Sequence, residues 1–194
     1  MKKLVAVLLT FLLILTGCNT VEVTKIDDEI KTDAIRFKNE YKKVSKNNIY
    51  KYSTYDNIIE TLNSKTGVIY LGFKDCFLCK EIVPILDKVS RQKKIREILY
   101  YDFKDIRENN TKEYQDLLNI VSSYIENEDE KETVITAPTV IFVRKGNIVG
   151  IYKGVVNNKS EEILNDEDKE KLENKFSSLI DKMFVNETTK GAND

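Results

Sequence analysis

The order of apolar and polar positions along the chain predicts an alternation of strands and helices. Residues 67–73 form a compact apolar run of β-favouring side chains, which predicts a buried strand. Downstream, apolar residues recur at i, i+3, i+4 and i+7, and this spacing predicts a helix with one apolar face: Ile82, Ile85, Leu86 and Val89. Residues 74–81 therefore connect the strand to the helix.

Six further elements follow from patterns of the same kinds. They are a helix around residues 58–62, capped by Ser53 or Thr54 and ended by Gly67; a strand at 98–103; a helix at 114–125; strands at 139–144 and 147–152, joined by a tight turn at Lys145-Gly146; and an amphipathic helix at 172–183. Crossover helices imply parallel strands, and the short turn implies an antiparallel pair. We expect an α/β domain with a mixed central sheet and helices on both faces.

The residues before this domain are polar and charged. Residues 27–43 have apolar side chains at roughly helical spacing, which predicts a short helix. We interpret residues 18–48 as a tether that ends in a loosely packed element, residues 49–185 as the folded domain, and residues 186–194 as a polar tail.

The first residues have the pattern of an export signal. Two lysines precede an apolar run at 4–15, which is too short to span a bilayer about 30 Å thick. The run ends in Leu15-Thr16-Gly17-Cys18, which resembles the lipobox of bacterial lipoproteins. The resemblance implies cleavage after residue 17, lipid on Cys18, and a location at the extracytoplasmic face of the cell membrane. The alternative is an ordinary cleaved signal with a chance cysteine.

The amino-acid composition limits the kinds of binding and catalysis that the chain can carry out. The chain has 31 basic and 32 acidic residues, a balance that argues against nucleic-acid binding. It has no histidine, which removes imidazole bases and His-containing metal sites. Three cysteines remain as the reactive side chains.

Two of the cysteines, Cys76 and Cys79, lie between the predicted strand and helix. A cysteine at a helix N-terminus has unpaired N–H groups nearby, which favour the thiolate that attacks disulfides. Zinc normally takes four Cys or His ligands, more than this pair offers, so we expect no metal. A purely structural disulfide is the other alternative, although closing so short a loop contributes little stability.

The arrangement resembles the thioredoxin family. Pro84 lies five residues after the second cysteine, and Thr136-Ala137-Pro138-Thr139 precedes the predicted hairpin, as in that family. The resemblance implies a thioredoxin-like fold, with Cys76 as the nucleophile and Cys79 as the resolving thiol. It also implies a cis bond before Pro138, substrate pairing beside Ala137, and no cofactor other than the redox-active disulfide.

The chain departs from the family at several positions. The spacer is Phe77-Leu78 and carries no charge, and Asp75 replaces an aromatic residue and opposes a thiolate unless Lys74 or Lys80 offsets it. Tyr70 stands where thioredoxin has a buried acid, so water or Glu81 is expected to deprotonate Cys79. The segments at 70–76 and 37–41 also resemble Gram-positive thioredoxin-like lipoproteins, some of them bacteriocin-transport accessory proteins.

From these residues and the resemblance we expect thiol–disulfide exchange on exported proteins. The expected partners are the thiols or disulfides of those proteins and a redox protein in the membrane or outside the cell. The direction, reductase or oxidase, stays open. The alternative is a non-catalytic binding module, or an accessory protein of a membrane transporter, that presents the groove beside Pro138.

Overall fold

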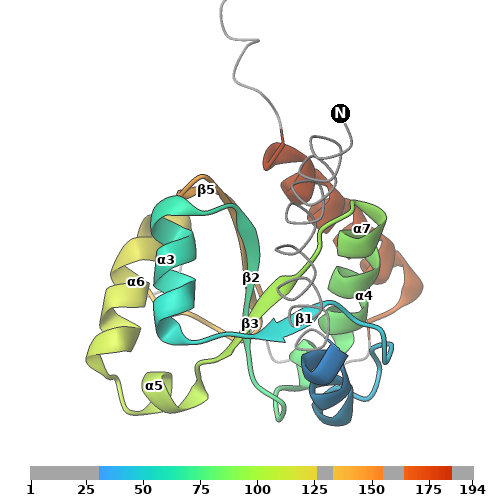
Figure 1. Ribbon diagram of the computed structural model, residues 1–194, viewed down its shortest axis with the longest axis horizontal. Coiled ribbons are helices and arrows are strands. Elements are labelled where there is room, and N and C mark those ends of the chain that lie inside the picture. Colours follow the sequence, from blue (N-terminus) through green and yellow to red (C-terminus); the bar gives the residue numbers. More distant parts are fainter. Residues whose placement is uncertain (1–30, 126–132, 155–163, 185–194) are drawn as a thin grey trace, which may run out of the picture.

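The computed structural model describes residues 31–125, 133–154 and 164–184, and they form a five-stranded mixed sheet covered on both faces by helices (Figure 1). The strand order is β1-β3-β2-β4-β5. The strands are β1 (Tyr50–Tyr52), β2 (Gly67–Gly72), β3 (Ile98–Asp102), β4 (Thr139–Arg144) and β5 (Asn147–Lys153). β1 and β2 flank β3 in parallel, whereas β4 pairs antiparallel with both β2 and β5. The predicted mixed sheet is confirmed.

The helices lie on two sides of the sheet (Figure 1). They are α3 (Tyr55–Ser64), α4 (Phe77–Gln92), α5 (Lys104–Glu108), α6 (Lys112–Ile125) and α7 (Asp166–Lys182). Two elements, β1 and α5, were not predicted from the sequence. Both are short, and neither offers the repeated apolar positions from which a period can be read.

Alternation along the central strand sends side chains into two separate cores. Val68 and Tyr70 of β2 face α4, α7 and the N-terminal helical residues 31–40, whereas Ile69 and Leu71 face α3 and α6. All four side chains are fully buried. The period of two within an apolar strand therefore assigns each helix to its face.

The N-terminal segment is part of the first core, which corrects the expectation of a loosely packed element before residue 49. Phe37 and Tyr41 are completely buried, and Phe37 stacks on Tyr41 and Tyr50 with ring centroids 4.3 and 3.9 Å apart. Asn48 secures the segment by donating to the Ala34 carbonyl at 2.8 Å. The physical reason is aromatic burial: these rings close the side of the first core that α4 and α7 leave open.

The structure confirms the predicted cap of the first domain helix and the predicted tight turn of the hairpin. The Thr54 hydroxyl accepts from Asn57 N and caps α3, which fixes one of the two candidate caps. The turn between β4 and β5 places Lys145 and Gly146 at φ of 47° and 76°. A side chain at Gly146 would overlap the backbone at Asn63, so the close approach of hairpin and α3 requires glycine there.

Three sequence expectations fall outside the described residues: the export signal, the lipid site at Cys18, and the polar tail at 186–194. In the part of the chain that is described, no helix is both long and apolar enough to cross a membrane.

Candidate active site around the disulfide

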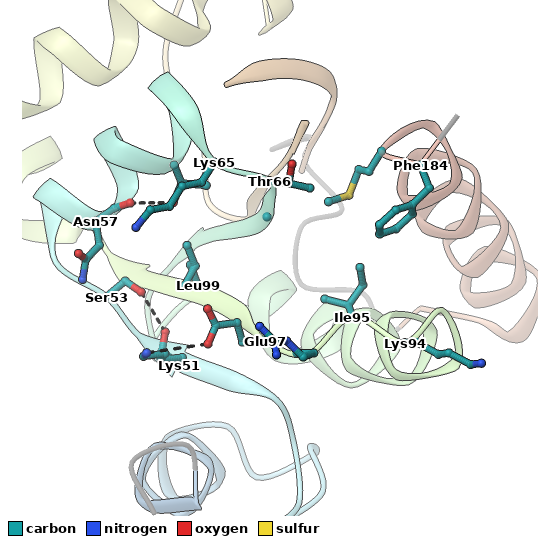
Figure 2. Close-up of a pocket in the computed structure, with 14 residues that line it drawn as sticks. Lys51, Ser53, Asn57, Lys65, Thr66, Lys94, Ile95, Glu97, Leu99 and Phe184 are labelled. Carbon is teal, nitrogen blue, oxygen red and sulfur yellow. Dashed lines mark hydrogen bonds and ion pairs between the residues drawn. The ribbon is translucent and has the colours of Figure 1, made fainter. Parts of the chain in front are cut away.

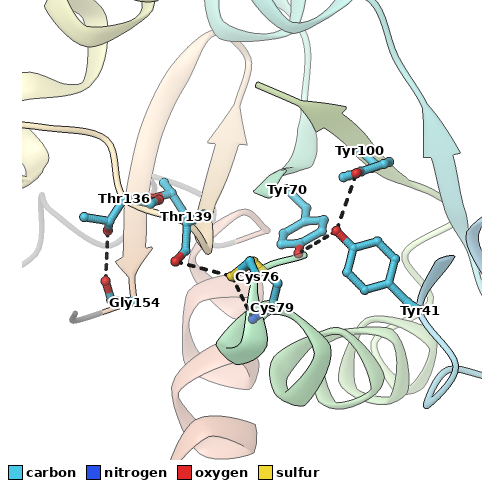
Figure 3. Close-up of a disulfide and its surroundings, with 9 residues drawn as sticks. Tyr41, Tyr70, Cys76, Cys79, Tyr100, Thr136, Thr139 and Gly154 are labelled. Atoms are coloured by element: carbon cyan, nitrogen blue, oxygen red, sulfur yellow. Dashed lines mark hydrogen bonds between the residues drawn. A yellow bond between two sulfur atoms is a disulfide. The ribbon is translucent and has the colours of Figure 1, made fainter. Parts of the chain in front are cut away.

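Cys76 and Cys79 are joined by a disulfide at the N-terminus of α4, with their Cα atoms 5.2 Å apart (Figure 3). β2 ends at Gly72, and a short turn leads from it into the helix, so the buried strand fixes where the pair begins. Cys76 is half-buried and Cys79 is fully buried. The two sulfurs are therefore unequal in access, as a nucleophile and a resolving thiol would be.

The sulfur of Cys76 is the N-cap acceptor of α4. Cys76 has extended backbone angles, and the Cys79 N–H donates to its sulfur at 3.1 Å. A helix N-terminus normally uses an oxygen of Ser, Thr, Asp or Asn at this position. The amide and the positive end of the helix dipole favour negative charge on that sulfur once the disulfide opens.

The segment around Pro138 lies against the disulfide. The Ala137–Pro138 bond is cis, as expected, and the carbonyl oxygen of Ala137 is 3.6 Å from the Cys76 sulfur. Pro138 is buried, whereas Ala137 is partly exposed. The structure thus brings Cys76 together with Ala137 and Pro138, which lie 61 and 62 positions further along the chain.

Thr136, Thr139 and Gly154 hold this segment in place. The two threonines belong to the segment that resembles the thioredoxin family, but none of the three residues was assigned a role in the site from the sequence. The Thr139 hydroxyl donates to the Thr136 carbonyl at 2.7 Å, and the Thr136 hydroxyl donates to Gly154 at 2.9 Å (Figure 3). Gly154 N–H in turn donates to the Pro138 carbonyl at 2.8 Å. No local pattern marks these bonds, because Gly154 lies at the far end of the hairpin.

The spacer residues have different positions within the first turn of α4. Leu78 packs against the first core, and a Cβ at Gly154 would lie 2.6 Å from Pro138 Cδ and 3.1 Å from Leu78 Cδ2. Leu78 and the Pro138 segment therefore meet across Gly154. Phe77 is half-buried, and Pro84 lies inside α4 as expected.

The charged residues near the pair are arranged differently from the sequence expectation. Asp75 forms an ion pair with Lys104 at 3.6 Å, a partner from α5 that the sequence did not suggest. Glu81, the expected base, is 7% exposed and is engaged by Lys43 of the N-terminal segment. Its carboxylate is therefore already neutralised by an ion pair.

A cluster of tyrosines lies on one side of the disulfide (Figure 3). Tyr70 donates to the Tyr41 hydroxyl and Tyr41 donates to the Tyr100 hydroxyl, each at 3.4 Å. Burial raises the pKa of Tyr70 well above its ordinary value, so a neutral phenol stands where the resemblance places a buried acid. The sequence showed the tyrosines but not their contacts, because the paired residues are 29 and 59 positions apart.

Neither a family model nor a curated protein matches this chain. The functional assignment therefore rests on the geometry and on the sequence. Among the described residues there is no group of three or more acidic, Cys or His side chains that could hold a metal ion.

A separate hollow of about 370 Å³ lies at the other end of the sheet, where the parallel strands begin (Figure 2). Gly67 and Leu99 are among its lining residues, and two of its cations, Lys51 and Lys65, form ion pairs with Glu97 at 3.9 Å and with Glu60 at 2.7 Å. Because Cys76 follows the opposite end of β2, this hollow is not part of the disulfide site.

Proposed function

We propose that this chain has a thioredoxin fold and is a thiol–disulfide oxidoreductase that acts on exported proteins. One observation carries the proposal: the Cys76–Cys79 disulfide begins a helix and lies against a cis-Pro138 segment. The α/β architecture, with α4 following the central strand β2, supports the fold assignment. We further propose that the chain is related to the Gram-positive thioredoxin-like lipoproteins that its sequence resembles.

The chemistry follows from the unequal access of the two sulfurs. The thiolate of Cys76, stabilised by the helix N-terminus, attacks a disulfide of the substrate and forms a mixed disulfide. Cys79 then attacks the Cys76 sulfur, forms the internal disulfide and releases the substrate thiol. The reverse sequence transfers the internal disulfide to a substrate dithiol. The edge beside Ala137 is the proposed contact for the substrate backbone.

The proposed location is the extracytoplasmic face of the cell membrane, with lipid on Cys18 as the anchor. A cysteine pair persists as a disulfide in oxidising surroundings, which agrees with export. To cycle, the pair needs a redox partner in the membrane or outside the cell, and the reaction direction depends on that partner.

The test is the reduction potential of the Cys76–Cys79 pair, measured by thiol trapping and mass spectrometry in glutathione redox buffers. A potential near −270 mV would identify a reductase, and one near −120 mV a disulfide donor. Cys79→Ser should accumulate a mixed disulfide with a model substrate, whereas Cys76→Ser should not. Cys18→Ser is the matched control and should leave the potential unchanged. If the wild-type pair does not exchange, the protein is a binding module.

A further inference from the structure

The inference concerns the proton of Cys79, and it rests on the proposed function. When Cys79 resolves a mixed disulfide, a bond forms between its sulfur and that of Cys76. The bond from Cys76 to the substrate sulfur breaks, and the substrate leaves as a thiolate with the electron pair. One proton must leave Cys79, whose side chain is fully buried and shielded from bulk water.

Three nearby carboxylates already have partners. Glu81 is paired with Lys43, and Asp75 is paired with Lys104. Asp87, further along α4, forms an ion pair with Arg91 at 3.8 Å and also accepts the Ile49 N–H at 2.9 Å. The chain contains no histidine. The proton of Cys79 therefore needs an acceptor other than these three carboxylates.

The tyrosine hydroxyls provide a route. Tyr70, Tyr41 and Tyr100 are fully buried and share the first core with Cys79. The three hydroxyl oxygens form a continuous series, from Tyr70 to Tyr41 and from Tyr41 to Tyr100. Because a hydroxyl group can both donate and accept, such a series can pass a proton in either direction. The 3.4 Å separations exceed the usual range for hydroxyl pairs, as catalytic hydrogen bonds often do before the reaction.

Burial raises the pKa of all three tyrosines above the ordinary value. Each hydroxyl consequently stays protonated at neutral pH. Such a group transmits a proton by accepting one and donating another in the same step, and it does not store charge.

Asp102 lies at the end of this series. It closes β3 and pairs in register with Gly72 of β2, where a side chain would overlap the Tyr70 hydroxyl. The absence of a side chain at Gly72 thus lets the Tyr70 hydroxyl lie over the strand end that faces Asp102. Tyr100 lies two residues before Asp102 on β3, so the two side chains project from the same face of the strand.

Asp102 also has access to water. Together with Tyr100 it lines a hollow of about 480 Å³ at the carboxyl ends of β1 and β3, whose rim includes Arg36, Glu40 and Lys74. A proton that arrives at Asp102 can therefore pass to solvent.

We propose that Asp102 accepts the proton that Cys79 loses, and that the hydroxyls of Tyr70, Tyr41 and Tyr100 carry it there. The surroundings of Asp102 suit an acceptor. Burial raises its pKa, and Asp105 of α5 and Glu40 of the N-terminal segment raise it further; the Lys104 N–H at 3.1 Å and the Lys104 charge lower it. A raised pKa brings a carboxylate closer to that of the thiol it serves.

The experiment follows the two steps of exchange separately. The reduced full chain, kept in detergent, is mixed with glutathione disulfide, quenched with acid and alkylated. Mass spectrometry then separates the mixed disulfide from the internal disulfide. Asp102→Asn and Tyr41→Phe are compared with Asp56→Asn, an exposed acid in the first turn of α3. Tyr41→Phe keeps the ring packing and removes only the hydroxyl that both neighbours contact.

We expect Asp102→Asn and Tyr41→Phe to form the mixed disulfide at the wild-type rate and to resolve it at least tenfold more slowly at pH 6. The difference should shrink towards pH 9, above the ordinary thiol pKa of about 8.5, because hydroxide then removes the proton. Wild-type resolution in both variants, or slowing by the same factor at every pH, would overturn the proposal. Absence of any mixed disulfide in the wild-type chain would instead refute the proposed function.

Discussion

Phe37→Ala is the sharpest test of how the N-terminal segment contributes to the fold. Phe37 is completely buried, stacks on Tyr41 and Tyr50, and meets Tyr52, Tyr70 and Tyr100 edge-on. Truncating a buried Phe to Ala costs about 3–5 kcal/mol. Each lost aromatic pair adds about 0.5–1.5 kcal/mol beyond burial, so the upper end of that range is expected.

The expected loss is therefore about 4–5 kcal/mol in the free energy of unfolding. For a chain of this size that lowers Tm by on the order of 10 °C. Guanidinium denaturation followed by far-UV circular dichroism measures the free energy directly. Ile35→Ala is the matched control, because Ile35 lies in the same helical segment and is 51% exposed. Its expected change is within about 0.5 kcal/mol of wild type.

The reasoning is refuted if Phe37→Ala unfolds within about 1 kcal/mol of wild type. In that case residues 31–48 would be peripheral, as the sequence alone suggested, and the folded domain would begin at residue 49. A loss in Ile35→Ala equal to that in Phe37→Ala would also count against it, since burial would then not be the cause.

Three further predictions concern individual side chains. The Tyr50 hydroxyl donates to the Val83 carbonyl at 2.9 Å inside the core, so Tyr50→Phe should lower the free energy of unfolding by about 1–1.5 kcal/mol in guanidinium titrations. Burial raises the pKa of Asp87, so the folded chain holds its proton more tightly than the unfolded one. The free energy of unfolding should therefore fall as pH rises from the ordinary Asp pKa of about 3.9 through the raised pKa of the folded chain. In denaturation experiments at pH 4–7, the free energy of unfolding of Asp87→Asn should depend less steeply on pH than that of the wild type. A side chain at Gly154 would collide with Pro138, so Gly154→Ala should slow attack by Cys76 on glutathione disulfide in a stopped-flow assay, while far-UV circular dichroism stays unchanged.

The sequence predicted the elements whose apolar period is long enough to read. The strand at β2, the helix at α4 and the β4–β5 hairpin were all expected, because each combines a clear period with a turn or cap signal. The three-residue strand β1 was missed, since Tyr-Lys-Tyr offers a single alternation within a polar region.

The packing of the N-terminal segment was also mispredicted. The helical spacing of Phe37 and Tyr41 predicts a helix, but the many lysines and asparagines around them indicated a loosely packed element and not one buried in the core. An aromatic pair at that spacing is the signal that would have assigned the segment to the core.

The features of the site also fall into those that the sequence predicted and those that it did not. The cysteine pair and Pro84 can be recognised by their spacing along the chain, and the cis bond was expected from the resemblance to the thioredoxin family. The ion pair of Asp75 with Lys104, the bond of Gly154 with Pro138 and the series of tyrosine hydroxyls depend on residues brought together by the sheet register. Residue spacing in a single sequence does not predict such contacts.

The sulfur that caps α4 also couples the oxidation state of the protein to its stability. A thiolate accepts hydrogen bonds more strongly than a disulfide sulfur, because its charge strengthens the bond. Opening the disulfide therefore strengthens the cap on Cys79 N–H while removing a covalent constraint on the unfolded chain. In a thermodynamic cycle, any substitution that weakens this cap in the reduced form shifts the equilibrium towards the oxidised form. The first turn of one helix thus sets how readily this protein takes up electrons.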